Sequence, residues 1–310
     1  MSRRYCLVCP CRDEEQYAAR TIDSVLAQSE PPALLVVVDD GSTDATPAIL
    51  ADRLGGVDFA RVVPSDRGGR RVLGAGVVVA FNRGLAEVDL DEVDYVCKLD
   101  LDLDLPPGYF AAMMDLMERD ERLGTVSGKP FFTGADGQVH QEISGDENSV
   151  GMAKFYRVQA FRDIGGLVPE LMWDGIDCHE LRRKGWRAMS TADPAVAFEH
   201  LRPMGSSDRG VLRGRRRHGQ GQWFMGSSLP FVLVSAVRRG LFPPAVTGSA
   251  NLLWGYVWAA VRRAPRYADA AFRRDLRRYQ REALVLGKRR AIARWEARVA
   301  SGAPMETVSR

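Results

Sequence analysis

The chain has 310 residues, 45% of them hydrophobic, which is enough for one α/β domain with a buried core plus an appendage and excludes a wholly disordered protein. The net charge of +3 is too balanced to indicate nucleic acid as the partner of the whole molecule. Residues 262–310, however, carry fourteen Arg or Lys and five Asp or Glu, a net +9, which leaves −6 on residues 1–261. A basic segment of this kind favours contact with an anionic surface, either lipid headgroups or nucleic acid.

Strands and helices alternate over residues 5–99. Short apolar runs predict strands over residues 5–9, 34–38, 59–63 and 95–99, and helical patterns cover residues 14–28, 43–54 and 77–86. This order favours an α/β fold with a mixed, mainly parallel sheet and helices on both faces, continued over residues 125–200. Ligands of such sheets bind at the carboxyl ends of the strands, where residues 10–14, 39–42 and 100–102 form three polar clusters.

The five cysteines indicate a reduced, structural role. Their number is odd, and Cys6, Cys9 and Cys11 crowd the first predicted strand, which is not a disulfide framework. The N-terminus lacks the apolar run of a signal peptide, and no stretch reaches the roughly 18–20 apolar residues that span a bilayer. We therefore expect a cytoplasmic protein that is peripheral at the inner face of the cell membrane.

Asp100 and Asp102 follow the predicted strand 95–99. Alternate residues of an extended segment project to the same side, so both carboxylates can approach one hard cation, Mn2+ or Mg2+, that is bound to a diphosphate. Such a cation offsets the charge that builds on a leaving nucleoside diphosphate. A calcium-binding EF-hand loop is excluded because Leu105 and Ala111 stand where Gly and Glu are required. An acidic turn without function is the alternative.

Four segments, in this order, resemble the pattern of glycosyltransferase family 2 over roughly residues 5–225. They are Pro10-Cys11-Arg12-Asp13-Glu14, with Asp13 where the family usually has Asn, then Val38-Asp39-Asp40-Gly41-Ser42-Thr43-Asp44 followed by Thr46, then Ala80-Phe81-Asn82-Arg83-Gly84, and finally Lys98-Leu99-Asp100-Leu101-Asp102. The resemblance implies a GT-A-type, Rossmann-like fold whose first two turns hold the nucleoside of the donor. The donor-binding residues that it implies are Pro10, Arg12, Glu14, Asp39, Asp40, Gly41 and Asp100. Arg71, in a Gly-rich loop, is a further candidate for the phosphates, and a solvated loop is the alternative.

The resemblance also implies a catalytic base and a third metal ligand. An inverting transferase needs a carboxylate that deprotonates the acceptor hydroxyl. Counting back from Gly185-Trp186 places Asp174 at the family's base position, although Trp173 replaces the usual acidic residue before it. Asp177, one helical turn on, is the second candidate, and either carboxylate could merely cap a helix. His200 stands where relatives often have a third metal ligand, and a polar surface residue is the alternative.

Other residues near the predicted base resemble the acceptor side of the family's site. Gly151 opens a segment, residues 151–157, that resembles the acceptor-side wall, and Trp173 is assigned to the same side. A helix packed on the sheet is the alternative interpretation of residues 151–157.

The C-terminal part of the chain differs in character, so we predict a catalytic domain over residues 1–225 and a helical appendage over residues 226–310. Residues 227–240 and 247–261 are apolar, with aromatic side chains beside arginines, and residues 266–298 form one long Arg-rich helical pattern. Such segments can lie in the interface of an anionic membrane, or can pack on the catalytic domain or on a second copy in a homo-oligomer. Nucleic acid is disfavoured because no stacking platform accompanies the basic residues.

The sequence therefore predicts an inverting, metal-dependent glycosyltransferase of the hexosyltransferase type. It would move a sugar from a nucleotide-diphosphate sugar, with UDP as the expected nucleotide, to a saccharide or lipid-linked acceptor in cell-surface polysaccharide synthesis. The alternative from another class is a catalytically silent nucleotide-binding scaffold subunit of a membrane glycan assembly.

Overall fold

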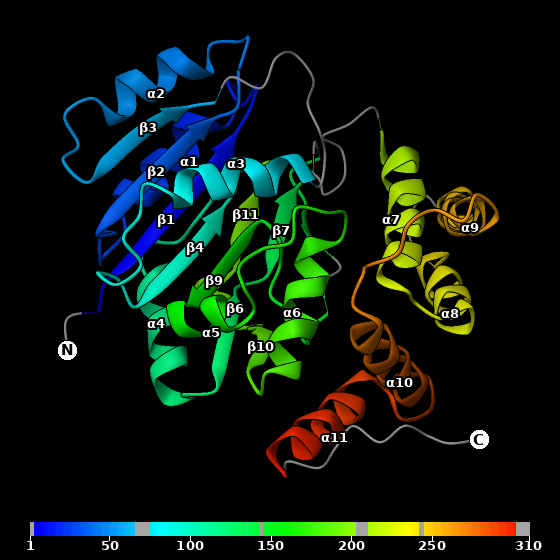
Figure 1. The fold of residues 1–310 in the computed structure, drawn as a ribbon. Coiled ribbons are helices and arrows are strands. Elements are labelled where there is room, and N and C mark those ends of the chain that lie inside the picture. Colours follow the sequence, from blue (N-terminus) through cyan, green and yellow to red (C-terminus); the bar gives the residue numbers. More distant parts are fainter. Residues whose placement is uncertain are drawn as a thin grey trace. The chain divides into compact units, whose positions relative to one another are not determined.

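The computed structural model describes residues 3–65, 75–134, 136–142, 145–202, 210–241 and 245–301. The chain forms two compact units, Met1–Arg202 and Pro203–Arg310 (Figure 1). Compactness alone defines these units, and the functional boundary at residue 225 stays a prediction.

The first unit is built on a seven-stranded sheet in the order β10-β6-β9-β4-β1-β2-β3. The strands are β1 (Tyr5–Cys11), β2 (Leu34–Asp39), β3 (Ala60–Pro64), β4 (Tyr95–Leu99), β6 (Leu123–Ser127), β9 (Ala153–Arg157) and β10 (Arg187–Ser190). Strands β1 to β4 are parallel, whereas β9 runs antiparallel to both β4 and β6. This confirms the predicted mixed, mainly parallel sheet. It also shows that the acceptor-side segment forms a strand where the alternative interpretation expected a helix.

Helices cover both faces of this sheet, as predicted. The helices of this unit are α1 (Ala18–Leu26), α2 (Thr46–Leu54), α3 (Ala75–Leu85), α4 (Tyr109–Arg119), α5 (Val158–Asp163) and α6 (Trp173–Arg183). Side chains of β1 alternate between the two faces: Leu7 packs with α1, α2 and α4, and Val8 packs with α3, α5 and α6. Helix α3 approaches the sheet closely, since a Cβ atom on Gly84 would lie 2.6 Å from Val8 and Val38.

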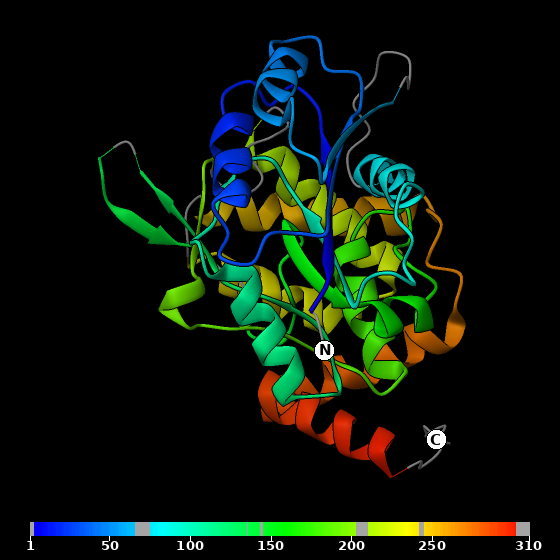
Figure 2. The same cartoon turned by 90° about the vertical axis from the view of Figure 1, so that its left-hand side faces the viewer.

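A smaller, four-stranded sheet, in the order β5-β11-β7-β8, adjoins the main sheet. Its strands are β5 (Leu103–Asp104), β7 (Pro130–Thr133), β8 (Val139–Gln141) and β11 (Phe198–His200), and a short 3-10 helix, η1 (Pro194–Val196), precedes β11. The hairpin of β7 and β8 projects from the unit (Figure 2). In the antiparallel pairing of β5 with β11, His200 lies opposite Leu103, which brings His200 beside Asp102.

The second unit consists of helices α7 (Val211–Met225), α8 (Leu229–Arg239), α9 (Ala245–Val261), α10 (Ala270–Leu286) and α11 (Lys288–Ala300). The long helix expected over residues 266–298 is wrong: Gly287, at φ +81°, separates α10 from α11. Within the described ranges, the structure contains no helix with the length and apolar character needed to cross a membrane.

Candidate active site at the carboxyl edge of the sheet

The turns after β1 and β2 are joined by hydrogen bonds. The backbone N–H of Asp13 donates to Ser42 Oγ at 3.0 Å, and the N–H of Thr43 donates to Asp13 Oδ1 at 2.8 Å. The N–H of Glu14 donates to Thr46 Oγ1 at 2.8 Å. Asp13 has φ +55°, a conformation that Asp and Asn tolerate better than other side chains, so Asp can stand at the Asn position of the motif. The polar side chains of residues 13 and 42–46 therefore hold the turn after β1 against the turn after β2.

The predicted nucleoside-binding residues lie on these turns. Asp39 pairs in register with Cys11 at the ends of β2 and β1. The Asp39 carboxylate accepts from the N–H of Ser42 at 2.9 Å, and the Asp40 carboxylate accepts from Ser65 Oγ at 2.9 Å. Gly41, at φ +76°, follows Asp40 in the turn after β2. The side chains of Asp39 and Asp40 are half-buried, and so is that of Arg12, whereas Pro10 is buried. The remaining donor-binding candidate, Arg71, lies outside the described residues.

Asp100 and Asp102 are each paired with a cation. Asp100 accepts from the buried ammonium of Lys98. Asp102, which is 3% exposed, lies 3.4 Å from His200 Nε2 and 2.6 Å from Arg202 Nε. Although burial alone would raise the pKa of Asp102, the hydrogen bond with His200 and the charge of Arg202 hold it below the usual range. The turn is therefore a buried charge cluster and not a solvated acidic loop.

Glu142 holds the imidazole of His200 from the other side. Its Oε2 lies 3.0 Å from His200 Nδ1, which leaves Nε2 directed to Asp102. Burial lowers the pKa of His200, but the hydrogen bonds with Asp102 and Glu142 outweigh it and raise that pKa to about 9. A carboxylate on the far nitrogen of an imidazole is a common arrangement behind metal-binding histidines.

A divalent cation would find only part of its ligands among these residues. In the part of the chain that the structure describes, no three His, Cys, Asp or Glu side chains are gathered as a ready metal site. However, Asp102 Oδ1 is buried without a hydrogen-bond partner among the described residues, and Oδ2 of the same carboxylate lies 3.4 Å from His200 Nε2. Mg2+ and similar cations are commonly held by one or two protein ligands plus substrate phosphates. Asp102 and His200, with Asp100 on the same turn, fit a cation that arrives with a diphosphate.

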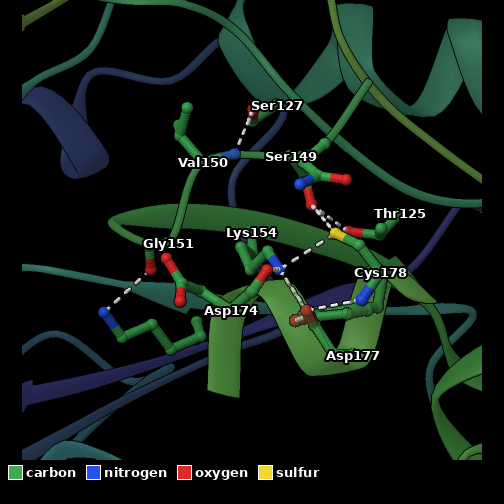
Figure 3. Close-up of polar contacts among 12 residues, drawn as sticks. Thr125, Ser127, Ser149, Val150, Gly151, Lys154, Asp174, Asp177 and Cys178 are labelled. Atoms are coloured by element: carbon green, nitrogen blue, oxygen red, sulfur yellow. Dashed lines mark hydrogen bonds and ion pairs between the residues drawn. The ribbon is translucent and has the colours of Figure 1, made fainter. Parts of the chain in front are cut away.

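The two base candidates on α6 have different environments (Figure 3). Asp177 is 3% exposed, and its carboxylate accepts from Lys154 Nζ at 2.6 Å, from Tyr156 Oη and from the N–H of Cys178. Asp174 is half-buried, and its carbonyl oxygen accepts from Lys154 Nζ at 2.6 Å. This geometry engages the carboxylate of Asp177 in a buried network and favours Asp174 as the base.

Gly151 and Lys98 connect Asp174 to the metal motif. Lys98 Nζ donates to the carbonyl oxygen of Gly151 at 3.0 Å as well as to Asp100. A Cβ atom on Gly151 would be 3.0 Å from Asp174 Oδ2, so the backbone of Gly151 lies against that carboxylate. The ring of Trp173 lies 5.2 Å from Lys98 Nζ and 5.5 Å from Lys154 Nζ, at cation–π distance from both. Gly151 thus lies between the predicted base and Lys98, and Trp173 lies beside both lysines.

Sequence reasoning missed Lys98, Glu142, Lys154 and Arg202 as members of the cluster. The two lysines could have been recognised from the sequence, because each interrupts an otherwise apolar strand. Lys98 stands between Cys97 and Leu99, and Lys154 stands between Ala153 and Phe155. A lysine that is fully buried in a strand needs a carboxylate partner. No comparable signal marks Glu142 and Arg202, whose partners are distant in sequence.

Solved structures share this fold. They include the mannosyltransferase PcManGT from Pyrobaculum calidifontis in complex with GDP-Man and Mn2+ (TM-score 0.55, 19% identity, 99% of this chain and 89% of that chain). Residues 1–349 of S. aureus TarS, in complex with UDP-GlcNAc, align with TM-score 0.55 and 15% identity over 98% of this chain and 93% of that chain. GalNAc-T7 with UDP, GalNAc and Mn2+ aligns with TM-score 0.54 and 11% identity over 85% of this chain and 55% of that chain. At these identities the likeness shows the GT-A fold alone.

Sequence comparison identifies the family. No curated protein sequence matches the chain. The model of glycosyl transferase family 2, in contrast, matches residues 6–172, more than half of the chain and all of the turns described above. The chain belongs to glycosyltransferase family 2.

Proposed function

We propose that this protein is an inverting glycosyltransferase that moves a sugar from a nucleotide-diphosphate sugar, with UDP as the expected nucleotide, to a saccharide or lipid-linked acceptor in cell-surface polysaccharide synthesis. The observation that carries the proposal is the joint placement of Asp102, His200 and Asp174 at one edge of the sheet. Lys98 and Gly151 bridge the two parts of this site. Solved structures of the same fold hold UDP-GlcNAc in one case and GDP-Man with Mn2+ in another, which supports a nucleotide-sugar donor.

Asp100, Asp102 and His200 would hold Mn2+ or Mg2+ at the diphosphate of the donor. When bound, the cation supplies Lewis-acid stabilisation of the charge on the leaving diphosphate. The turns of Pro10, Arg12 and Glu14 and of Asp39, Asp40 and Gly41 would hold the nucleoside. Asp13 and Thr46 lock these two turns together, which supports a common binding place for the nucleoside.

Asp174 would act as the base. Its carboxylate takes the proton of the acceptor hydroxyl while the hydroxyl oxygen forms a bond to the anomeric carbon. The bond from that carbon to the diphosphate oxygen breaks on the opposite face, and the diphosphate leaves with the electron pair. Lys154 fixes the main chain at Asp174, and Trp173 and Gly151 would form the wall on the acceptor side.

Donor turnover tests this proposal and separates it from a silent scaffold. Thermal-shift measurements with UDP-, GDP- and dTDP-sugars, with and without Mn2+, identify the donor, and release of its nucleoside diphosphate then reports turnover. We expect Asp174→Asn to keep donor binding and to lose transfer, and Asp102→Ala to lose both metal-dependent binding and turnover. Asp52→Asn, which changes an exposed carboxylate on α2, is the matched control. A wild-type protein that binds the donor without turning it over would be a scaffold.

We also propose that the second unit attaches the enzyme to the inner face of the cell membrane. Helices α8 and α9 expose large apolar side chains, among them Val237 (73% exposed), Val246 (80%) and Val261 (70%). Arg238 follows Val237 and Arg262 follows Val261 in the chain, and the Arg262 guanidinium lies over Trp258 at 4.5 Å from the ring centroid. Apolar side chains beside arginines suit an anionic bilayer surface.

Flotation with liposomes of anionic lipid tests the attachment. We expect the protein to float at low salt, and Val237→Ser together with Val261→Ser to abolish flotation. Protein that stays at the bottom and elutes as a dimer would instead assign the apolar face to a homo-oligomer.

A further inference from the structure

Arg202 forms an ion pair with Asp102, the carboxylate that a divalent metal would need. Its Nε lies 2.6 Å from Asp102 Oδ2, and its Nη2 donates to Glu14 Oε1 at 2.7 Å. The guanidinium also lies over the ring of Tyr17, 5.5 Å from the centroid. One arginine, directly after β11, therefore ties the turn that follows β1 to the turn that follows β4.

The two carboxylates that Arg202 joins are both buried, Glu14 at 5% exposure and Asp102 at 3%. Carboxylates removed from water need a counter-charge nearby. His200 Nε2 also lies 3.4 Å from Asp102 Oδ2. The chain thus supplies a counter-charge for Asp102 from its own side chains.

A divalent cation on Asp102 would share this carboxylate with the guanidinium. Asp102 Oδ2 is already engaged by Arg202, and only Oδ1 is left without a partner among the described residues. Two cations on one carboxylate lie within a few ångströms of each other and repel, and burial weakens the screening. The metal can bind tightly only when Arg202 finds another anion, and the planar guanidinium matches the oxygens of a diphosphate well.

We propose that the guanidinium of Arg202 competes with the divalent metal for the carboxylate of Asp102. The free enzyme then binds the metal weakly, and the metal binds tightly only together with a diphosphate. This rests on the proposed function, since the metal is the one expected there. It assigns to Arg202 a role that the motif does not contain: setting the affinity of the free enzyme for its cation.

Titration of the nucleotide-free protein with Mn2+ alone tests this role, with free Mn2+ followed by its paramagnetic resonance signal. We expect Arg202→Gln to bind Mn2+ about tenfold more tightly than the wild type, because a charge-assisted contact with Asp102 is lost. Arg202→Lys keeps the charge but only part of the contacts and is expected to show an intermediate gain. The lysine variant tests the proposal if the glutamine variant folds poorly.

Arg20→Gln is the matched control. Arg20 also joins two carboxylates, those of Asp104 and Glu199, at 2.7 and 2.6 Å, but lies outside the Asp102 cluster, so its loss changes the net charge equally. We expect its Mn2+ affinity to equal that of the wild type. Equal or weaker binding in both Arg202 variants, or an equal gain in Arg20→Gln, would overturn the role of Arg202 and leave the proposed function standing. Binding of Mn2+ alone by none of the proteins would likewise overturn the role of Arg202, whereas the proposed function is tested with the nucleotide present.

Discussion

Gly151 lies directly against the carboxylate of Asp174: a Cβ atom on Gly151 would be 3.0 Å from Asp174 Oδ2 and 3.2 Å from Asp174 Cβ. Gly151→Ala therefore has to displace the predicted base by a few tenths of an ångström. We expect the rate of sugar transfer to fall about tenfold or more, because catalysis is sensitive to small misplacements of a base. Donor affinity should stay unchanged, since the turns after β1 and β2 are not touched.

Steady-state kinetics with varied donor check this prediction. Gly108→Ala is the control, because a Cβ atom there meets nothing within 4 Å. Unchanged turnover in Gly151→Ala would show that Asp174 does not need its present position.

Asp177→Asn should destabilise the protein, whereas Asp174→Asn should not. The substitution at Asp177 leaves the ammonium of Lys154, which is 0% exposed, without its carboxylate partner. Breaking a buried ion pair in this way costs about 3 kcal/mol of unfolding free energy. Urea denaturation measures the difference, and equal midpoints for the two variants would contradict the structural role given to Asp177.

His200 gives the metal-free protein a stability that depends on pH. Its pKa is raised from 6.5 to about 9 in the folded state, despite burial, by the hydrogen bonds with Asp102 and Glu142. A raised pKa stabilises the fold fully below pH 6.5, and this contribution disappears as the pH rises through 9. We expect it to amount to roughly 2–3 kcal/mol.

The comparison of wild type with His200→Gln isolates this contribution. In the presence of a chelator, the difference in unfolding free energy should be largest near pH 6 and should shrink by pH 9. A difference that stays constant over this interval would show that His200 does not change protonation there.

Helices α7 and α9 touch through glycines. A Cβ atom on Gly219 would lie 1.9 Å from the carbonyl oxygen of Leu252, and one on Gly255 would lie 2.0 Å from that of Arg216. Gly219→Ala forces the helices apart, and overpacking of this kind costs about 2 kcal/mol. We expect a lower thermal midpoint for the second unit, with Thr247→Ala, an exposed change on α9, as the control. An unaltered midpoint would mean that the helices do not approach this closely.

The sheet and its polar edge could be predicted from the sequence because strand signals are local. Apolar runs such as Leu34–Val38, followed by Asp39 and Asp40, identify both a buried strand and its carboxyl end. The two helices expected from residues 14 and 43 start later, at Ala18 and Thr46. The backbone N–H groups that would open them donate instead to side chains of the opposite turn, a long-range preference that no local pattern reveals.

The charge pairs of the site could not be predicted, because they depend on tertiary contacts. Arg202 and Glu14 lie 188 positions apart, and Glu142, directly after β8, reaches His200 across 58 positions. In the sequence only the spacing to Gly185-Trp186 ranks Asp174 before Asp177, and it is the strand β9 that shows how their environments differ. Lys154 and Tyr156 on that strand engage the carboxylate of Asp177 and leave that of Asp174 beside Gly151.

The most direct test of a metal and diphosphate site is calorimetry of nucleotide binding. UDP, GDP and dTDP are titrated with and without Mn2+ into the wild type, Asp102→Asn and Asp104→Asn. Asp104 belongs to the same segment but pairs with Arg20, so it controls for loss of a nearby carboxylate. We predict that one nucleotide binds the wild type and Asp104→Asn at least about tenfold more tightly with Mn2+, and that Asp102→Asn loses this gain. Absence of binding by every nucleotide with Mn2+ present, or an undiminished gain in Asp102→Asn, would contradict a metal and diphosphate site at this edge of the sheet.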